Sequence, residues 1–99
     1  MIIKHIILWK LKADVTDKTS VAADIKAGLE GLVGVVPGLV EATVRFEGLA
    51  SSTADVMLDS TFDSEASLKA YKTHPAHVAV ADGKVRPFVE TRLCLDYES

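Results

Sequence analysis

The segment IIKHIILWKLK, residues 2–12, carries the pattern that decides the first element of the fold. Its odd-numbered positions hold large apolar side chains together with one histidine: Ile3, His5, Ile7, Trp9 and Leu11. Strict alternation of this kind is typical of a β-strand that buries one face. The even-numbered positions mix lysines with Ile2, Ile6 and Leu8, which favours a central strand that is partly covered on both faces.

Outward from this strand, the apolar residues follow first a helical period and then a strand period. From Thr16 to Val36 they recur every three or four residues, which predicts an amphipathic helix with Thr16 as its N-cap. Pro37-Gly38 ends that helix. Alternation over residues 40–47 and 54–62 predicts two strands.

The remaining residues predict a second, interrupted helix and a closing strand. Asp63 or Ser64 is a suitable N-cap for the helix. It is interrupted at His74-Pro75, where the proline fits the first turn of a continuation that reaches Val85. Alternation over residues 88–97 predicts the last strand.

The order strand, helix, strand, strand, helix, strand predicts an α+β fold of the ferredoxin-like βαββαβ type. In this fold both helices cover one face of a four-stranded antiparallel sheet. We expect the apolar faces of all four strands, with His5 among them, to meet under the helices. For the last strand this face is predicted to carry Val89, Leu93, Leu95 and Tyr97.

The opposite sheet face has no helix to cover it. It is expected to mix apolar with charged side chains: Ile6, Leu8, Met57, Cys94, Arg45, Asp59, Glu90 and Arg92. Because a second copy of the chain would cover this face economically, we expect a homodimer whose two sheets enclose a barrel.

Composition narrows the class of protein. The chain has 99 residues, 48% hydrophobic and 25% charged, which predicts one folded domain over residues 1–99. A net charge of −3 lacks the positive field that nucleic acid requires. The only cysteine, Cys94, excludes an internal disulfide, and the apolar runs are too short to cross a membrane. We therefore expect a cytoplasmic protein with no nucleic-acid or membrane partner.

The residues with the clearest chemical potential are His5, Tyr71 and His77. His5 is polar within an apolar face, so it is either a hydrogen-bonded core histidine or part of a pocket. His77 can project toward the same sheet, and a phenol beside an imidazole forms a workable acid-base pair. His74 and His77 alone are an incomplete metal-ligand set, and Cys94 is expected to be a packed thiol away from any histidine. No cofactor motif or metal site is predicted.

Several segments together carry a family resemblance. They are Lys4-His5-Ile6-Ile7-Leu8-Trp9-Lys10, Pro37-Gly38, Tyr71-Lys72-Thr73-His74-Pro75-Ala76-His77 and Val85-Arg86-Pro87. Over essentially its whole length the sequence resembles the stress-responsive dimeric α/β-barrel (Dabb) family, which implies a ferredoxin-like protomer and a dimeric barrel. Many members of this family have no assigned activity.

The resemblance extends to an enzymatic member of the family, the plant olivetolic acid cyclase, a cofactor-free polyketide cyclase. It implies that His77 removes a proton α to a carbonyl, that Tyr71 holds His77 or the carbonyl, and that His5 lines the cleft. The expected ligand is a small hydrophobic carbonyl or polyketide-like compound. The first helix carries Val21, Ala22, Ala23 and Ile25 where that cyclase has bulky aromatics, so its particular substrate is not implied.

Three hypotheses on function follow. The first is a cofactor-independent acid-base enzyme of cyclase or lyase type that uses His77, Tyr71 and His5. The second is a dimer that binds a small ligand or takes part in a stress response without catalysis. The third, from a looser likeness to antibiotic biosynthesis monooxygenases, is a cofactor-free oxygenase.

Overall fold

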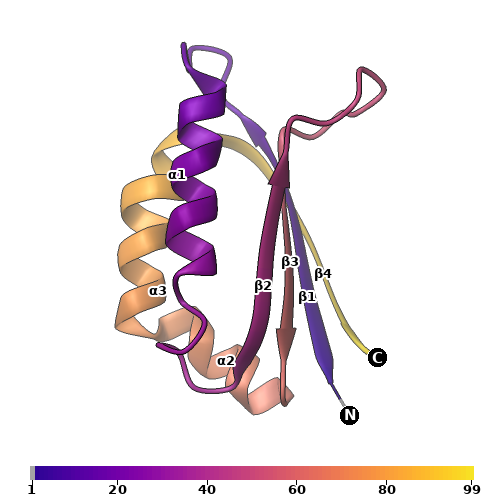
Figure 1. The fold of residues 1–99 in the computed structure, drawn as a ribbon, viewed down its shortest axis with the longest axis vertical. Helices are drawn as coiled ribbons and strands as arrows, with labels where there is room; N and C mark the ends of the chain where they lie inside the picture. The colour runs from indigo at the N-terminus through magenta and orange to yellow at the C-terminus, as the bar shows by residue number, and fades with distance from the viewer. Residues whose placement is uncertain (1) are drawn as a thin grey trace.

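The computed structural model describes residues 2–99 and confirms the expected order of elements (Figure 1). A π-helical turn at Ala81–Val85 continues the last α-helix to Val85, as the sequence predicted, and a 3-10 turn at Arg86–Phe88 leads into the last strand. The helices and strands are β1 (Ile3–Leu11), α1 (Lys18–Glu30), β2 (Leu39–Phe46), β3 (Val56–Phe62), α2 (Glu65–Thr73), α3 (Pro75–Val80) and β4 (Val89–Glu98).

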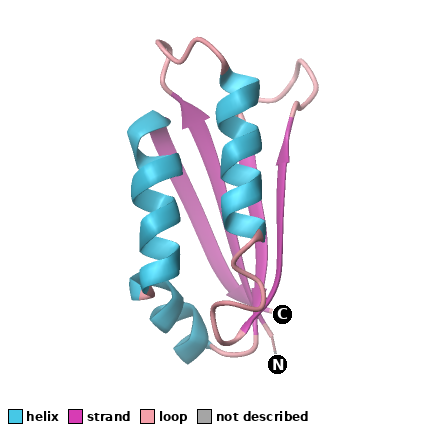
Figure 2. Ribbon diagram, turned by 60° about the vertical axis from the view of Figure 1, so that its left-hand side comes forward, coloured by secondary structure: helices cyan, strands magenta, loops and turns pink. Residues whose placement is uncertain are grey.

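The four strands form one antiparallel sheet in the order β2-β3-β1-β4. The first strand of the chain is therefore central, as the apolar residues on its second face predicted, and β4 lies at an edge. The three helices lie together on one face of the sheet (Figure 2). This is the ferredoxin-like βαββαβ arrangement.

The first helix is shorter than its apolar periodicity predicted. It begins at Lys18 because the Asp17 side chain, rather than Thr16, accepts a hydrogen bond from the Ser20 backbone N–H at 3.0 Å. It ends before Gly31, although Leu32 and Val36 beyond it are still buried. The apolar spacing of three or four residues therefore extends past the end of the helix, because Leu32 and Val36 pack against the core from the turns that follow it.

The second helical region breaks where the sequence predicted. Ser64 caps α2 by accepting the Ser67 N–H at 3.1 Å. His74 then caps α3, because its Nδ1 accepts the Ala76 N–H at 3.1 Å while Pro75 occupies the first helical position. The imidazole of His74 is thus used as the N-cap of α3.

The core lies between the helices and the sheet. Ile25 of α1 and Phe62 of β3 are 0% exposed. Gly38 allows the chain to enter β2 close to α2, since it has a φ of +83° and a Cβ there would collide with the Ser67 side chain. Gly38 thereby fixes how closely α2 approaches the sheet.

The prediction for the buried face of β4 is wrong beyond Val89. Lys10 pairs with Thr91 while Leu11 pairs with Val89, so Glu90 is an extra residue in a β-bulge. A one-residue insertion reverses the side of every later side chain. Leu93, Leu95 and Tyr97 consequently face away from the helices and are 64%, 63% and 44% exposed.

The same bulge overturns the expected position of two polar side chains. Arg92 and Cys94 pair with Trp9 and Ile7 of β1, so they lie on the helix side of the sheet and not on the open face. A second irregularity at the start of β2 leaves Val40 57% exposed and buries Leu39 instead.

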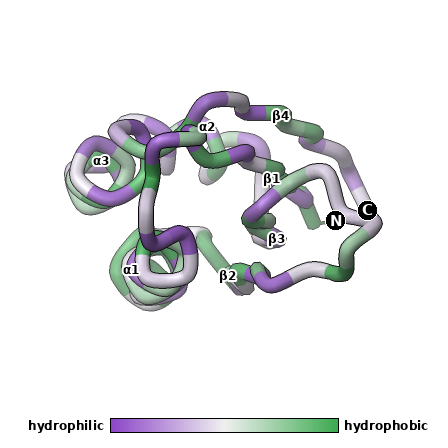
Figure 3. Tube along the Cα trace, turned by 90° about the horizontal axis from the view of Figure 1, so that it is seen from above, coloured by the Kyte–Doolittle hydropathy of each residue, from purple (hydrophilic) through white to green (hydrophobic). Residues whose placement is uncertain are grey.

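The view along the strands shows the helices on one side of the sheet only (Figure 3). On the other face β4 adds its apolar residues to Ile6 and Leu8 of β1, which lie opposite Leu95 and Leu93. Within residues 2–99, no helix has the length and apolar character needed to cross a membrane.

Candidate functional site

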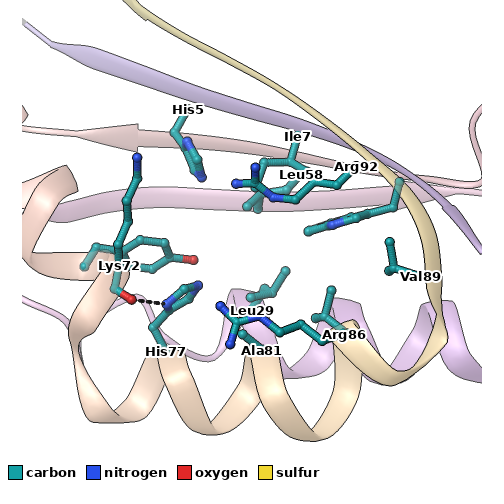
Figure 4. Close-up of a pocket in the computed structure, with 13 residues that line it drawn as sticks. His5, Ile7, Leu29, Leu58, Lys72, His77, Ala81, Arg86, Val89 and Arg92 are labelled. Atoms are coloured by element: carbon teal, nitrogen blue, oxygen red, sulfur yellow. Dashed lines mark hydrogen bonds between the residues drawn. The ribbon is translucent and has the colours of Figure 1, made fainter.

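A cavity of about 580 Å³ lies between the sheet and the second helical region (Figure 4). This volume is in the range that holds small organic ligands. Apolar side chains from β1, β3, β4, α1 and the turn after α3 form much of its wall: Ile7, Trp9, Leu29, Leu58, Ala81, Val85 and Val89. The polar lining residues are His5, Tyr71, Lys72, His77, Arg86 and Arg92.

His77 projects into this cavity from the first turn of α3 (Figure 4). Its Nδ1 lies 3.3 Å from the Lys72 carbonyl oxygen. Because a carbonyl only accepts hydrogen bonds, Nδ1 must carry the proton, and the lone pair of the neutral ring is on Nε2. Burial lowers the pKa of His77; the hydrogen bond to the Lys72 carbonyl opposes this shift, and the positive charge of Arg86 adds to it. The ring is thus held as a neutral base.

Tyr71 lies beside His77 and is 2% exposed. The centroid of its ring is 4.1 Å from that of His77 and 4.9 Å from that of Phe62. Burial raises the pKa of Tyr71 to about 12, so the phenol keeps its proton and can donate a hydrogen bond.

His5 enters the cavity from β1 and is also 2% exposed. Its Nδ1 is hydrogen-bonded to the Asp96 carboxylate, which faces it directly across the β1–β4 pair. Burial lowers the pKa of His5, although Asp96 opposes this shift. Burial alone would raise the pKa of Asp96, but the hydrogen bond with His5 brings it below its ordinary value. His5 is thus both a hydrogen-bonded buried histidine and a lining residue.

The three residues predicted from the sequence therefore lie around one cavity. The ring of Tyr71 lies between the two histidines, 6.2 Å from His5 and 4.1 Å from His77 between centroids. His5 comes from the start of the chain, whereas Tyr71 and His77 come from either side of the break between α2 and α3. His74 does not join them, because its side chain caps α3.

The sequence reasoning missed the β4 side of the site. Cys94 was expected far from any histidine, yet its Sγ lies 3.7 Å from Nδ1 of His5 and 3.4 Å from Oδ1 of Asp96. Arg92 lines the cavity from the same strand. All three residues follow the Glu90 bulge, so only the register of the sheet could have revealed them.

His5, Cys94 and Asp96 form the single cluster of three potential metal ligands in the part of the chain that the structure describes. Their ligand atoms lie within 4.8 Å of one another. The cluster does not favour a metal as it stands, because Nδ1 of His5 is already bonded to Asp96, and burial raises the pKa of the Cys94 thiol. A metal would have to displace both arrangements.

Fold and cavity together define a ferredoxin-like α+β protein with a ligand-sized cavity between its helices and its sheet. The chain belongs to the Dabb family, the stress responsive A/B barrel domain, whose family model matches residues 3–99.

Two proteins are identical to this chain at about a third of the aligned positions. It is 32% identical over 97 residues to a stress-response A/B barrel domain-containing protein of Arabidopsis thaliana, covering 97% of this chain and 36% of that protein. The chain thus spans about a third of the length of that relative. A dimeric protein of unknown function from Bacteroides fragilis has a similar structure with a TM-score of 0.90 and 33% identity, over 99% of this chain and 96% of that one.

Another protein of known structure is more distant in sequence. Hydroxynitrile lyase from Passiflora edulis has a TM-score of 0.79 at 20% identity, over 97% of this chain and 91% of the lyase. At this identity the likeness shows the fold alone.

Proposed function

We propose that the protein is a cofactor-independent acid-base enzyme that removes a proton next to the carbonyl of a small, largely apolar compound. The observation that carries the proposal is the placement of His77: its imidazole lines the cavity, its Nδ1 lies against the Lys72 carbonyl oxygen, and its Nε2 makes no hydrogen bond to the protein within residues 2–99. A general base needs this arrangement.

In the proposed reaction, Nε2 of His77 takes the α-proton of the substrate. The electron pair of the broken C–H bond forms a carbon–carbon double bond, and the carbonyl oxygen becomes an enolate oxygen. Tyr71 donates a hydrogen bond to that oxygen. The enolate then takes the proton back from protonated His77, or its α-carbon attacks a second carbonyl of the same molecule. In the second case the carbonyl π bond breaks and the resulting alkoxide takes the proton from His77, which would be the cyclase reaction.

The two roles considered for Tyr71 are not equally supported. In residues 2–99 the hydrogen bond that positions His77 comes from the Lys72 backbone, so Tyr71 is not required to hold the imidazole. Its phenol remains protonated, as a donor to an enolate must be. We therefore assign Tyr71 to the substrate oxygen and His5, held by Asp96, to the cavity wall beside it.

This assignment agrees with the roles implied by the resemblance to olivetolic acid cyclase. The cavity wall does not imply the same substrate. The apolar residues that α1 and the strands contribute to the wall are aliphatic apart from Trp9. It offers a general apolar surface and no feature specific to one polyketide.

The test is solvent deuterium exchange at the α-carbon of 4-phenylbutan-2-one in D₂O, followed by proton NMR. We expect the wild-type protein to accelerate exchange, and Tyr71→Phe and His77→Gln each to reduce the acceleration strongly. A folded wild-type protein that binds the ketone without accelerating exchange would instead identify a non-catalytic binding protein. Oxygen uptake with a phenolic probe would identify the oxygenase alternative.

We also propose that the chain forms a homodimer through the open face of the sheet. Leu8, Leu93, Leu95 and Tyr97 are each between 38% and 64% exposed on this face. They form one continuous apolar strip along the paired strands β1 and β4. Such a strip is typical of an interface. The B. fragilis protein of similar structure is dimeric, which supports a dimer for this chain.

A further inference from the structure

The charged residues of the cavity are all cationic. Lys72, Arg86 and Arg92 line it, and no aspartate or glutamate does so among the described lining residues. This is unusual for a chain whose net charge is −3. The side of the cavity that faces the histidines is therefore positive, although the protein as a whole is not.

The two guanidinium groups come from opposite sides of the cavity. Arg92 extends from β4, and Arg86 from the turn that follows α3 (Figure 4). Both charged ends point toward the region where His5 and His77 lie (Figure 4). The positive charges of both arginines lower the pKa of His77, which agrees with this placement.

These cations are only partly neutralised by the protein. Lys72 reaches Asp96 at 3.8 Å, and Arg86 is paired with Asp82, which does not line the cavity. Arg92 has no carboxylate within ion-pair distance in the part of the chain that the structure describes. A guanidinium presents five N–H donors in a planar fork, so Arg92 keeps its full capacity to bind an anion and Arg86 keeps part of it.

We infer that the cavity binds a carboxylate, held between Arg92 and Arg86, and that the substrate is an oxo acid with an apolar body. The arginines match a carboxylate in charge and in planar geometry. Trp9, Leu29 and Leu58 provide the apolar wall for the remainder of the molecule. The oxo group in this inference rests on the proposed function, whereas the carboxylate site does not.

The test compares two probes that have no ketone and cannot react: 3-phenylpropanoate and its neutral amide, 3-phenylpropanamide. Binding is measured by calorimetry or by NMR titration. We expect the carboxylate to bind the wild-type protein at least about tenfold more tightly than the amide, because charge-assisted hydrogen bonds are about twice as strong as neutral ones. Equal binding of the two probes, or no binding of the carboxylate at millimolar concentration, would overturn the inference.

Variants locate the site. Arg92→Gln should reduce the preference for the carboxylate to less than about threefold, and Arg92→Lys, which keeps the charge but loses the fork, should give an intermediate preference. Lys69→Gln removes one positive charge from α2 outside the cavity lining and should change nothing. If Arg92→Gln unfolds, Arg92→Lys still decides the question. A full preference in a folded Arg92 variant would contradict the site.

His77→Gln separates this inference from the proposed function. We expect this variant to lose α-proton exchange on 4-phenylbutan-2-one while keeping its preference for 3-phenylpropanoate. If the wild-type protein binds the ketone without accelerating its exchange but prefers the carboxylate, the acid-base mechanism is wrong and the anion site stands. If it exchanges the ketone but binds both probes equally, the reverse holds.

Discussion

Replacing Leu95 by lysine should dissociate the proposed dimer. Leu95 is 63% exposed on the open sheet face, and its β1 neighbour there is Ile6. Burying a whole leucine side chain stabilises by about 1.5–3 kcal/mol, so burying the exposed part of Leu95 is worth about 1–2 kcal/mol. A two-fold symmetric interface contains this residue twice. The expected loss is therefore about 2–4 kcal/mol, or roughly a 30- to 700-fold increase in Kd.

The measurement is sedimentation velocity or light scattering over a range of protein concentrations. Leu49→Lys is a matched control, because Leu49 is 82% exposed but lies in the loop between β2 and β3. We expect the wild-type protein and Leu49→Lys to be dimers at micromolar concentration and Leu95→Lys to be largely monomeric. Two results would refute the reasoning: a monomeric wild-type protein, or a Leu95→Lys variant that dimerises as tightly as the control.

Three other predictions concern the site and its support. The pKa of His77 is lowered below its ordinary value of 6.5, so the midpoint of the acid-side fall in α-proton exchange should lie below pH 6.5, and a midpoint at or above 6.5 would contradict this. His77→Gln should reduce kcat/KM by about 10²–10⁴-fold. Asp96→Asn should lower the free energy of unfolding at pH 7 by about 1–3 kcal/mol, since it removes the ionised partner of His5. The pKa of Asp96 is lowered in the folded state, so this difference, measured in urea, should shrink as the pH falls below 3.8, and a pH-independent difference would count against it. Both Gly34 and Gly38 have a positive φ, so alanine at either position should cost about 1–3 kcal/mol of backbone strain. Only at Gly38 would the added Cβ also meet other side chains, so Gly38→Ala should destabilise more than Gly34→Ala in thermal unfolding. Equal effects would show that the contact with α2 is unimportant.

The sequence predicts most of the fold because local patterns and global architecture agree in it. The alternation of β1 and β3 matches their buried faces, and the interruption at His74-Pro75 is the observed boundary between α2 and α3. The convergence of His5 with Tyr71 and His77 could also be anticipated. It requires only the strand order and the helix-covered face, both of which follow from the order of elements.

The β4 side of the site could not be predicted in the same way. Val89 and Leu95 have the same parity in the sequence, yet the first is on the helix side of the sheet and the second on the open face. The alternation of apolar and polar residues does not reveal a bulge. The extra residue, Glu90, shifts the pairing of β4 with β1 but leaves the alternation in the sequence unchanged. Arg92 and Cys94 were misplaced for the same reason.

Because of the bulge, the two faces of β4 contribute to two different sites, the cavity and the proposed dimer interface. On its helix side, Arg92 lines the cavity and pairs with no carboxylate among residues 2–99, and Asp96 is the partner of His5. Its other face carries Leu93 and Leu95, the most exposed apolar side chains of the proposed interface. Within one copy β4 is an edge strand paired only with β1, and such strands open readily when nothing covers them. A second copy packed on the outer face would hold the strand in place, so dimer formation and the geometry of the site depend on the same ten residues. The bulge at Glu90 therefore does more than move a pattern by one residue: without it, the leucines would fill the cavity and the carboxylate of Asp96 would lie in the interface.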